Sequence, residues 1–253
     1  MKSGLNHIIC VTVFLFSSLI TKAQTGNWTS LGRPEMAKLF DKMNNWFKNT
    51  ASYSLIITHA SYENYNTMVP VERSVGYFKK DKNDYHSFLL GIHTVQNSVY
   101  KIVIDSSEKI MMVANPDQLT WNTYTAGDYE VMLKNCVAVK KMNNSVEKKY
   151  RIEFAAGSAI SHYEFVFDQD EFLKEVISYY GLEIKKDGDD KNSPKVKPRI
   201  SILFSGYKIS PVLNYKEEFD ESKYFFRKNG KLVPAERYRT FKLSDQRIYK
   251  KTE

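Results

Sequence analysis

Residues 100–113 read Tyr100-Lys101-Ile102-Val103-Ile104-Asp105-Ser106-Ser107-Glu108-Lys109-Ile110-Met111-Met112-Val113. Two short runs rich in apolar and β-branched residues flank four polar residues. This pattern is typical of two antiparallel strands joined by a turn. We therefore expect strands over 99–105 and 109–114, and an antiparallel sheet as the framework of the chain.

The sequence before this stretch alternates between apolar and polar residues with a period of two, as in half-buried strands. A first strand places Tyr53, Leu55, Ile57 and His59 on one face. A second strand is expected over 71–80. A third is expected over 85–92, with Phe88, Leu90 and Ile92 on one face.

Strand patterns return after residue 136. We expect strands over 137–142, 148–155, 161–168 and 199–207, with Tyr163, Phe165 and Phe167 pointing inward. Residues 172–184 fit a helix or a strand, and the strands on both sides favour a strand. Asn229-Gly230 is the preferred dipeptide of a two-residue hairpin turn, and residues 235–243 end the domain.

One long helix is expected, near the N-terminus. Met36, Leu39, Phe40, Met43, Trp46 and Phe47 recur at helical spacing after Pro34, which is favourable in the first turn. The apolar stripe of this helix must be buried, either on the body of its own domain or as a lid over a ligand cavity. Residues 128–135 fit a short helix, because Tyr129, Met132 and Leu133 lie at helical spacing.

These elements predict an α+β fold that is mainly antiparallel β, with an amphipathic N-terminal helix and roughly ten strands in a single domain over residues 24–253. Strands do not alternate with long helices, so a parallel α/β sheet is not expected.

Residues 1–23 have the three parts of a secretory signal peptide. Lys2 precedes a mostly apolar run over 8–20, and Thr21-Lys22-Ala23 offers small residues for cleavage after Ala23. We expect a soluble periplasmic protein without a lipid anchor, because no acceptor cysteine follows the run. Cys10 would be removed, leaving Cys136 as a buried apolar residue without a disulfide partner.

No catalytic or cofactor motif is present. The chain lacks a glycine-rich phosphate loop, and His59, His86, His93 and His162 are not at metal-ligand spacing. Asp168, Asp170 and Glu171 fit a solvated turn. The net charge of +8 comes from interleaved basic and acidic residues, so a solvated basic surface is expected rather than a nucleic-acid partner.

One helix followed by an antiparallel meander, in an exported chain rich in aromatic residues, resembles the LolA and LolB family of periplasmic lipoprotein carriers. The resemblance is one of layout. It covers the helix Met36–Phe47, the hairpin quoted above and late strands such as Arg199–Phe204. It implies a half-open β-barrel whose concave side is covered by helices and holds acyl chains in an apolar cavity.

Three functions follow from these observations. The first is a periplasmic carrier that binds a lipid or an acylated protein and has no enzymatic activity. The second is an envelope protein–protein interaction module with a filled barrel. The third is a secreted hydrolase, which would need clustered carboxylates. In the carrier, the cavity would be lined by Tyr53, Leu55, Ile57, Phe88, Leu90, Phe165 and Phe167, with Met36, Phe40, Met43 and Trp46 as the lid.

Overall fold

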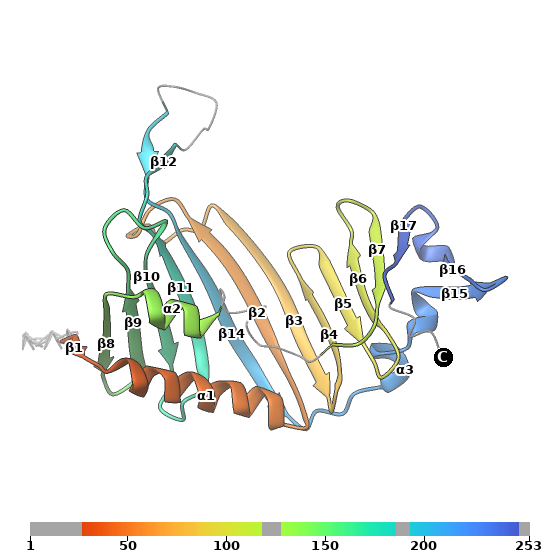
Figure 1. Cartoon of the computed structure of the whole chain (residues 1–253), viewed down its shortest axis with the longest axis horizontal. Coiled ribbons are helices and arrows are strands. Elements are labelled where there is room, and N and C mark those ends of the chain that lie inside the picture. Colours follow the sequence, from red (N-terminus) through yellow and green to blue (C-terminus); the bar gives the residue numbers. More distant parts are fainter. Residues whose placement is uncertain (1–26, 118–127, 186–192, 248–253) are drawn as a thin grey trace, which may run out of the picture.

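A single sheet of 13 strands forms the body of the protein (Figure 1). The structure is a computed structural model, and it describes residues 27–117, 128–185 and 193–247. The strand order is β1-β8-β9-β10-β11-β14-β2-β3-β4-β5-β6-β7-β17. All neighbouring strands are antiparallel except β17, which pairs with β7 in the parallel sense. The sheet is not closed into a barrel, because its edge strands β1 and β17 do not pair with each other.

The sheet strands are β1 Thr29–Ser30, β2 Ser52–Tyr62, β3 Glu72–Asp81, β4 Asp84–Leu89, β5 Ile92–Gln96, β6 Lys101–Asp105, β7 Ile110–Ala114, β8 Ala138–Asn143, β9 Lys148–Glu153, β10 Ile160–Phe167, β11 Leu173–Tyr180, β14 Arg199–Ile209 and β17 Lys242–Asp245. Two small hairpins are β12 Ile184–Lys185 with β13 Lys195–Val196, and β15 Phe225–Lys228 with β16 Lys231–Pro234. The helices are α1 Arg33–Asn49, α2 Tyr129–Asn135 and α3 Tyr215–Glu218, and the 3₁₀ turns are η2 Glu221–Lys223 and η3 Glu236–Tyr238.

The expected antiparallel α+β architecture is confirmed, but the sheet has 13 strands rather than roughly ten. The expected single strand over 85–92 is wrong. Leu90 and Gly91 both have positive φ, 52° and 80°, and they form a tight turn between β4 and β5. A turn with two positive φ values reverses the chain, so Phe88, Leu90 and Ile92 do not share one face of a strand.

Other sequence predictions are confirmed. The ambiguous stretch 172–184 contains β11, and the short helix α2 begins after Asp128, whose side chain accepts hydrogen bonds from the N–H groups of Glu130 and Val131. Asn229 and Gly230 have φ of 51° and 76° and form the turn between β15 and β16. The predicted signal peptide, Cys10 and the polar residues 186–192 lie outside the described residues.

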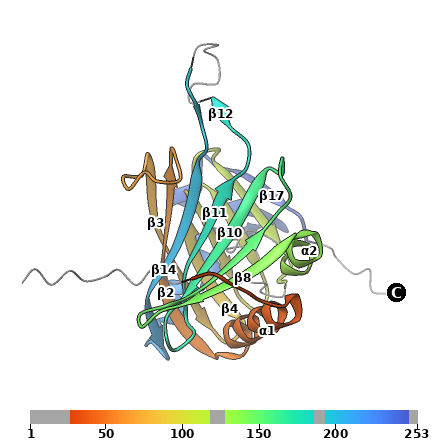
Figure 2. The same ribbon diagram turned by 90° about the vertical axis from the view of Figure 1, so that its left-hand side faces the viewer.

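The first core lies on the face of the sheet that carries Tyr53, Leu55, Ile57 and Phe165, which we call the helix face. Both α1 and α2 pack on this face (Figure 2). The opposite face of the same strands is polar, with ion pairs such as Arg151–Glu164 and Lys140–Glu153. An antiparallel sheet with one buried and one solvated face produces this alternation.

The second core lies on the opposite face, at the other end of the sheet. It joins Val95, Ile102, Ile104, Met111 and Val113 of β5, β6 and β7 to three side chains of the C-terminal segment, which are Tyr224, Phe225 and Tyr238. No pattern in the sequence predicts this layer. No helix within the described residues is long and apolar enough to cross a membrane.

Candidate functional site

Helix α1 is fixed against the helix face at both of its ends. Just before its start the Leu31 N–H donates to the Val139 carbonyl of β8 at 2.9 Å. The Glu35 side chain caps the helix itself by accepting a hydrogen bond from the Gly32 N–H at 2.9 Å. At its end Lys80, only 4% exposed, donates from Nζ to the carbonyl oxygens of Lys48 and Thr50 at 3.3 and 2.5 Å. A cation at a helix C-terminus also interacts favourably with the helix dipole. Burial lowers the pKa of Lys80.

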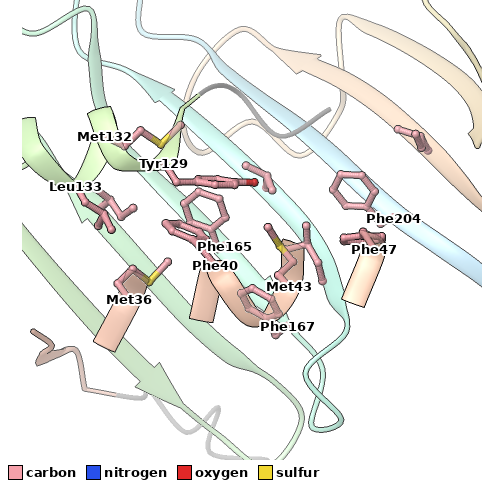
Figure 3. Packing of buried hydrophobic residues seen from close by; sticks show 14 of the residues in the cluster. Met36, Phe40, Met43, Phe47, Tyr129, Met132, Leu133, Phe165, Phe167 and Phe204 are labelled. Carbon is pink, nitrogen blue, oxygen red and sulfur yellow. The ribbon is translucent and has the colours of Figure 1, made fainter. Parts of the chain in front are cut away.

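Four apolar side chains of α1, one from each turn, point into the sheet. Met36, Phe40, Met43 and Phe47 are all less than 7% exposed. Phe40 stacks on Tyr129 of α2 at a ring-centroid distance of 3.9 Å and meets Phe165 of β10 edge-on at 5.0 Å. Figure 3 shows these rings together, so α1, α2 and the sheet share one aromatic contact.

Trp46 lies at the edge of this contact rather than inside it. It is half-buried, and its ring centroid lies 4.8 to 6.0 Å from those of Phe47, Tyr53, Phe172 and Tyr207. Tyr207 donates its hydroxyl hydrogen to the Leu173 carbonyl at 2.6 Å, and burial raises the pKa of this tyrosine. The C-terminal half of α1 therefore rests on a cluster of aromatic rings.

An ionic contact holds the middle of α1 to the β10–β11 turn. Glu171, which has a positive φ of 67°, pairs with Lys42 of α1 and with Lys148 of β9. These two lysines hold the pKa of Glu171 below its ordinary value. Because Lys42 is largely exposed, this contact orients the helix more than it stabilises it.

Three hollows surround the helices. A small one of about 70 Å³ lies under α1, between Met43, Trp46, Phe167 and Leu173. An open groove of about 320 Å³ runs beside α2 and is lined by Met132, Phe154, Ile160 and Tyr163 among others. A third, of about 400 Å³, separates α1 from α2 and has a polar rim that includes Asp41, Asn44 and Asp128.

Beyond the helices, the helix face continues with half-buried side chains. Phe154, Tyr163 and Ile202 pack against the first core from this region. Burial raises the pKa of Tyr163. The buried Nδ1 atom of His59 has no hydrogen-bond partner within the described residues, as is also true of Oδ1 of Asn44. This part of the face is thus mainly apolar, with a few polar groups.

The structure brings most of the predicted site residues together. Eight of them belong to the first core, and Trp46 packs against it; the eight are Tyr53, Leu55, Ile57, Phe165, Phe167, Met36, Phe40 and Met43. Phe88 and Leu90 lie elsewhere. Phe88 pairs with Tyr77 and stacks near His93 on the opposite face, and Leu90 is 47% exposed in the β4–β5 turn. Both followed from the mistaken single strand.

Several residues of the first core were not among the predicted site residues. Phe47 belongs to the predicted apolar stripe, and Tyr129, Met132 and Leu133 of the predicted helix α2 close the face from a second side. Their helical spacing was visible in the sequence, but it does not show which face of the sheet they cover. Phe204 of β14 also joins the core.

Among the described residues, no cluster of three His, Cys, Asp or Glu side chains is arranged to hold a metal ion. Asp168 forms a local turn, since its side chain accepts the Phe172 N–H at 2.9 Å. Cys136 is 3% exposed, with its thiol directed at the Leu133 carbonyl. Apart from these polar groups, the helix face is an apolar surface.

Comparison with known proteins gives only distant likenesses. No model of a known protein family matches the chain, and no curated protein matches its sequence. Among solved structures, an uncharacterized conserved protein from Thermus thermophilus is 6% identical, with a TM-score of 0.42, over 84% of this chain and 99% of that one. The Mycobacterium tuberculosis lipoprotein LppX is 9% identical, with a TM-score of 0.35, over 72% and 99%.

A third solved structure is described as a LolA superfamily protein from Nitrosomonas europaea, the superfamily that the sequence resembles. It is 9% identical, with a TM-score of 0.28, over 74% of this chain and 98% of that one. TM-scores of this size are too low to transfer a function to this chain.

Proposed function

We propose that this protein binds the acyl chain of a lipid or lipoprotein on the helix face, and carries it without chemical change. The observation that supports this most is the continuous apolar face that runs from the residues under α1 to the open groove beside α2. Only part of that face is covered by the helices. An apolar surface rimmed by polar residues is typical of a binding site.

In this proposal α1 is a lid that must move for a chain to enter fully. Pockets for small ligands usually measure about 300–1,000 Å³. The hollow under α1 is far below that range at about 70 Å³, whereas the groove beside α2 reaches its lower limit at about 320 Å³. A ligand would enter along the groove, past Ile160 and Tyr163. It would then displace Met43 and Phe47 from the sheet.

The energy of such binding is sufficient without any charged group. Burial of an acyl chain contributes about 0.8 kcal/mol per CH₂. A chain of about 12 carbons would thus gain roughly 10 kcal/mol, from which the costs of association and of lid opening are subtracted. Ligand affinity should therefore rise with chain length and depend little on salt.

The first experiment is native mass spectrometry of the mature protein from its own envelope fraction, followed by lipid extraction. We expect a co-purifying lipid or acylated peptide at near-unit occupancy. Phe165→Asp, which places a carboxylate under α1, should abolish that occupancy. Because this variant can fail to fold, Ile160→Gln tests the groove at a half-buried position. Ile56→Gln is the matched control, since Ile56 is 45% exposed on the opposite face of β2.

A second measurement follows the lid itself. Trp28→Phe and Trp121→Phe leave Trp46 as the only tryptophan of the chain. Titration with a long-chain fatty acid should then change the Trp46 fluorescence, because the ring leaves its contacts with Tyr53 and Tyr207. A clean apo mass together with no response to fatty acids would overturn the proposal. It would favour the alternative, an interaction module whose apolar face is permanently filled by α1.

We further propose that the protein works in the periplasm, after cleavage following Ala23. The signal-peptide pattern of residues 1–23 supports this. N-terminal sequencing of the protein from the periplasmic fraction should start at Gln24, and a start at Met1 would contradict the proposal.

A further inference from the structure

The positive charge of the chain is concentrated near its C-terminus. Residues 221–247 contain eight lysines and arginines against three acidic residues, a net charge of +5, while the whole chain carries +8. This segment folds as one layer, from η2 through the β15–β16 hairpin and η3 to β17. A local field of one sign attracts partners of the opposite sign.

The acidic residues of this layer already form hydrogen bonds or ion pairs within the protein. Glu221 accepts a hydrogen bond from the Asn97 side chain at 2.6 Å. Glu236 pairs with Arg239 at 2.8 Å, and Asp245 pairs with Arg247. Lys228, Lys231, Arg237 and Lys242 are exposed and have no ion pair with any described residue. They remain available to an external anion.

The β15–β16 hairpin presents an apolar side chain together with two of these lysines. Lys228 and Lys231 lie directly opposite each other beside the Asn229-Gly230 turn, and like charges in that position repel. Phe226, 48% exposed, pairs with Val233 and lies on the same side of the hairpin as the two lysines, because side chains alternate along a strand. The other side of the hairpin holds Phe225 and Leu232 in the second core.

We propose that the outward side of the β15–β16 hairpin docks on an anionic lipid bilayer. An aromatic side chain beside two lysines suits the boundary of a membrane, where the ring enters the headgroup layer and the ammonium groups meet lipid phosphates. The hairpin projects from the end of the molecule farthest from α2 (Figure 1). Its rigid base, Phe225 and Tyr224, is held in the second core. The surface is separate from the helix face, so it can act whether or not that face is loaded.

The test is sedimentation of the mature protein with vesicles of phosphatidylcholine, with and without phosphatidylglycerol. We expect binding only where phosphatidylglycerol is present, and weakening by added salt. Lys228→Gln with Lys231→Gln should lower the vesicle affinity about 25-fold at low salt, about fivefold for each lysine. Phe226→Ser should also lower the affinity, and its effect should persist when salt is added.

The β12–β13 hairpin provides a matched control. Lys185 and Lys195 also lie directly opposite each other and are exposed. Lys185→Gln with Lys195→Gln removes the same charge and should leave vesicle binding nearly unchanged. An equal loss in this control would overturn the proposal, because it would show attraction to net charge alone. Equal binding to pure phosphatidylcholine would also overturn it.

Failure of this proposal can be told apart from failure of the carrier function. A folded Ile160→Gln protein should bind anionic vesicles as the wild type does, even if it no longer holds a fatty acid. If the wild type does not bind the vesicles at all, the surface is not a membrane contact. Retention on immobilised DNA in that case would assign it to nucleic acid.

Discussion

At the scale of single residues, Gly76 decides how the middle of the sheet is built. A Cβ atom placed on this glycine would lie 1.9 Å from the carbonyl oxygen of Phe88 and 2.9 Å from its carbonyl carbon. The end of β4 therefore passes closer to β3 than any side chain allows. Since the obstacle is backbone, it cannot move aside by a rotamer change.

We predict that Gly76→Ala destabilises the protein by about 2 kcal/mol or more, within the range expected for overpacking. The measurement is the free energy of unfolding in urea. Ser74→Ala, a half-buried position two residues away on the same strand, should change that free energy by less than about 1 kcal/mol. Equal free energies of unfolding for the two variants would show that the backbone of β4 shifts easily to make room for the added methyl group.

His86 is a second residue with an unusual environment. Its Nε2 lies 2.9 Å from the Tyr77 hydroxyl, and its Nδ1 lies 3.1 Å from Glu218 Oε2. Burial lowers the pKa of His86 below its ordinary value of 6.5, although Glu218 acts in the opposite direction. Burial raises the pKa of Tyr77 to about 12. The ring therefore stays neutral in the folded protein at a pH where the unfolded chain is protonated.

This difference predicts a loss of stability in acid. As pH falls below 6.5, the unfolded chain binds a proton at His86 that the folded protein does not, so the free energy of unfolding should decrease. His86→Gln should make its dependence on pH shallower between about pH 7 and 5. Some slope will remain, because burial also lowers the pKa values of His93 and His162. An unchanged slope would mean that His86 titrates alike in both states.

At the scale of elements, α1 depends on a residue far from it in the sequence. Lys80 of β3 closes the C-terminus of the helix through the carbonyl groups of Lys48 and Thr50. The same ammonium group lies 5.6 Å from the ring centroid of Tyr53. Docking of the helix thus includes a polar contact as well as the apolar stripe.

We predict that Lys80→Met weakens this docking by about 1–3 kcal/mol, because two carbonyl groups lose a buried donor. Amide hydrogen exchange should become faster over residues 43–49 and stay unchanged in the C-terminal layer. Lys82→Met, at an exposed position two residues later, is the control. Unchanged exchange in α1 would show that the apolar stripe alone fixes the helix.

The elements also show what the sequence could and could not predict. Helical spacing predicted α1, and alternation predicted β2 and β3, because one face of each is buried. Two apolar runs on either side of a polar turn predicted β6 and β7. Leu90-Gly91 was missed because leucine seldom adopts a positive φ, so the dipeptide does not look like a turn. Ile102-Val103-Ile104 is apolar on both faces, so the sequence does not show that the C-terminal layer covers one of them.

At the scale of the whole molecule, two cores lie on opposite faces and near opposite ends of the sheet. The first core forms the proposed binding face, and the second holds the hairpin proposed to meet a membrane. The proposed binding of an acyl chain and the proposed docking on a membrane thus belong to separate layers, joined by the strands β3 and β4.

We predict that Phe225→Ala costs about 3–5 kcal/mol, the usual cost of removing a buried phenylalanine. Phe225 is 3% exposed in the second core. Limited proteolysis should then cut within residues 219–241 first, while fatty-acid binding on the helix face is retained at temperatures below unfolding. A simultaneous loss of fatty-acid binding would show that the two layers are not independent.

The pairing of β2 with β14 has a consequence for how the protein is made. These two strands of 11 residues lie side by side in the middle of the sheet, yet Tyr53 pairs with Ile209 and Tyr62 with Arg199. Contacts between such distant parts of a chain slow folding. During synthesis β2 can pair with β3 along one edge, but its other edge has no partner until β14 has been made. This interval exposes the chain to aggregation, so folding in the cell should depend on a chaperone that shields β2 until β14 arrives.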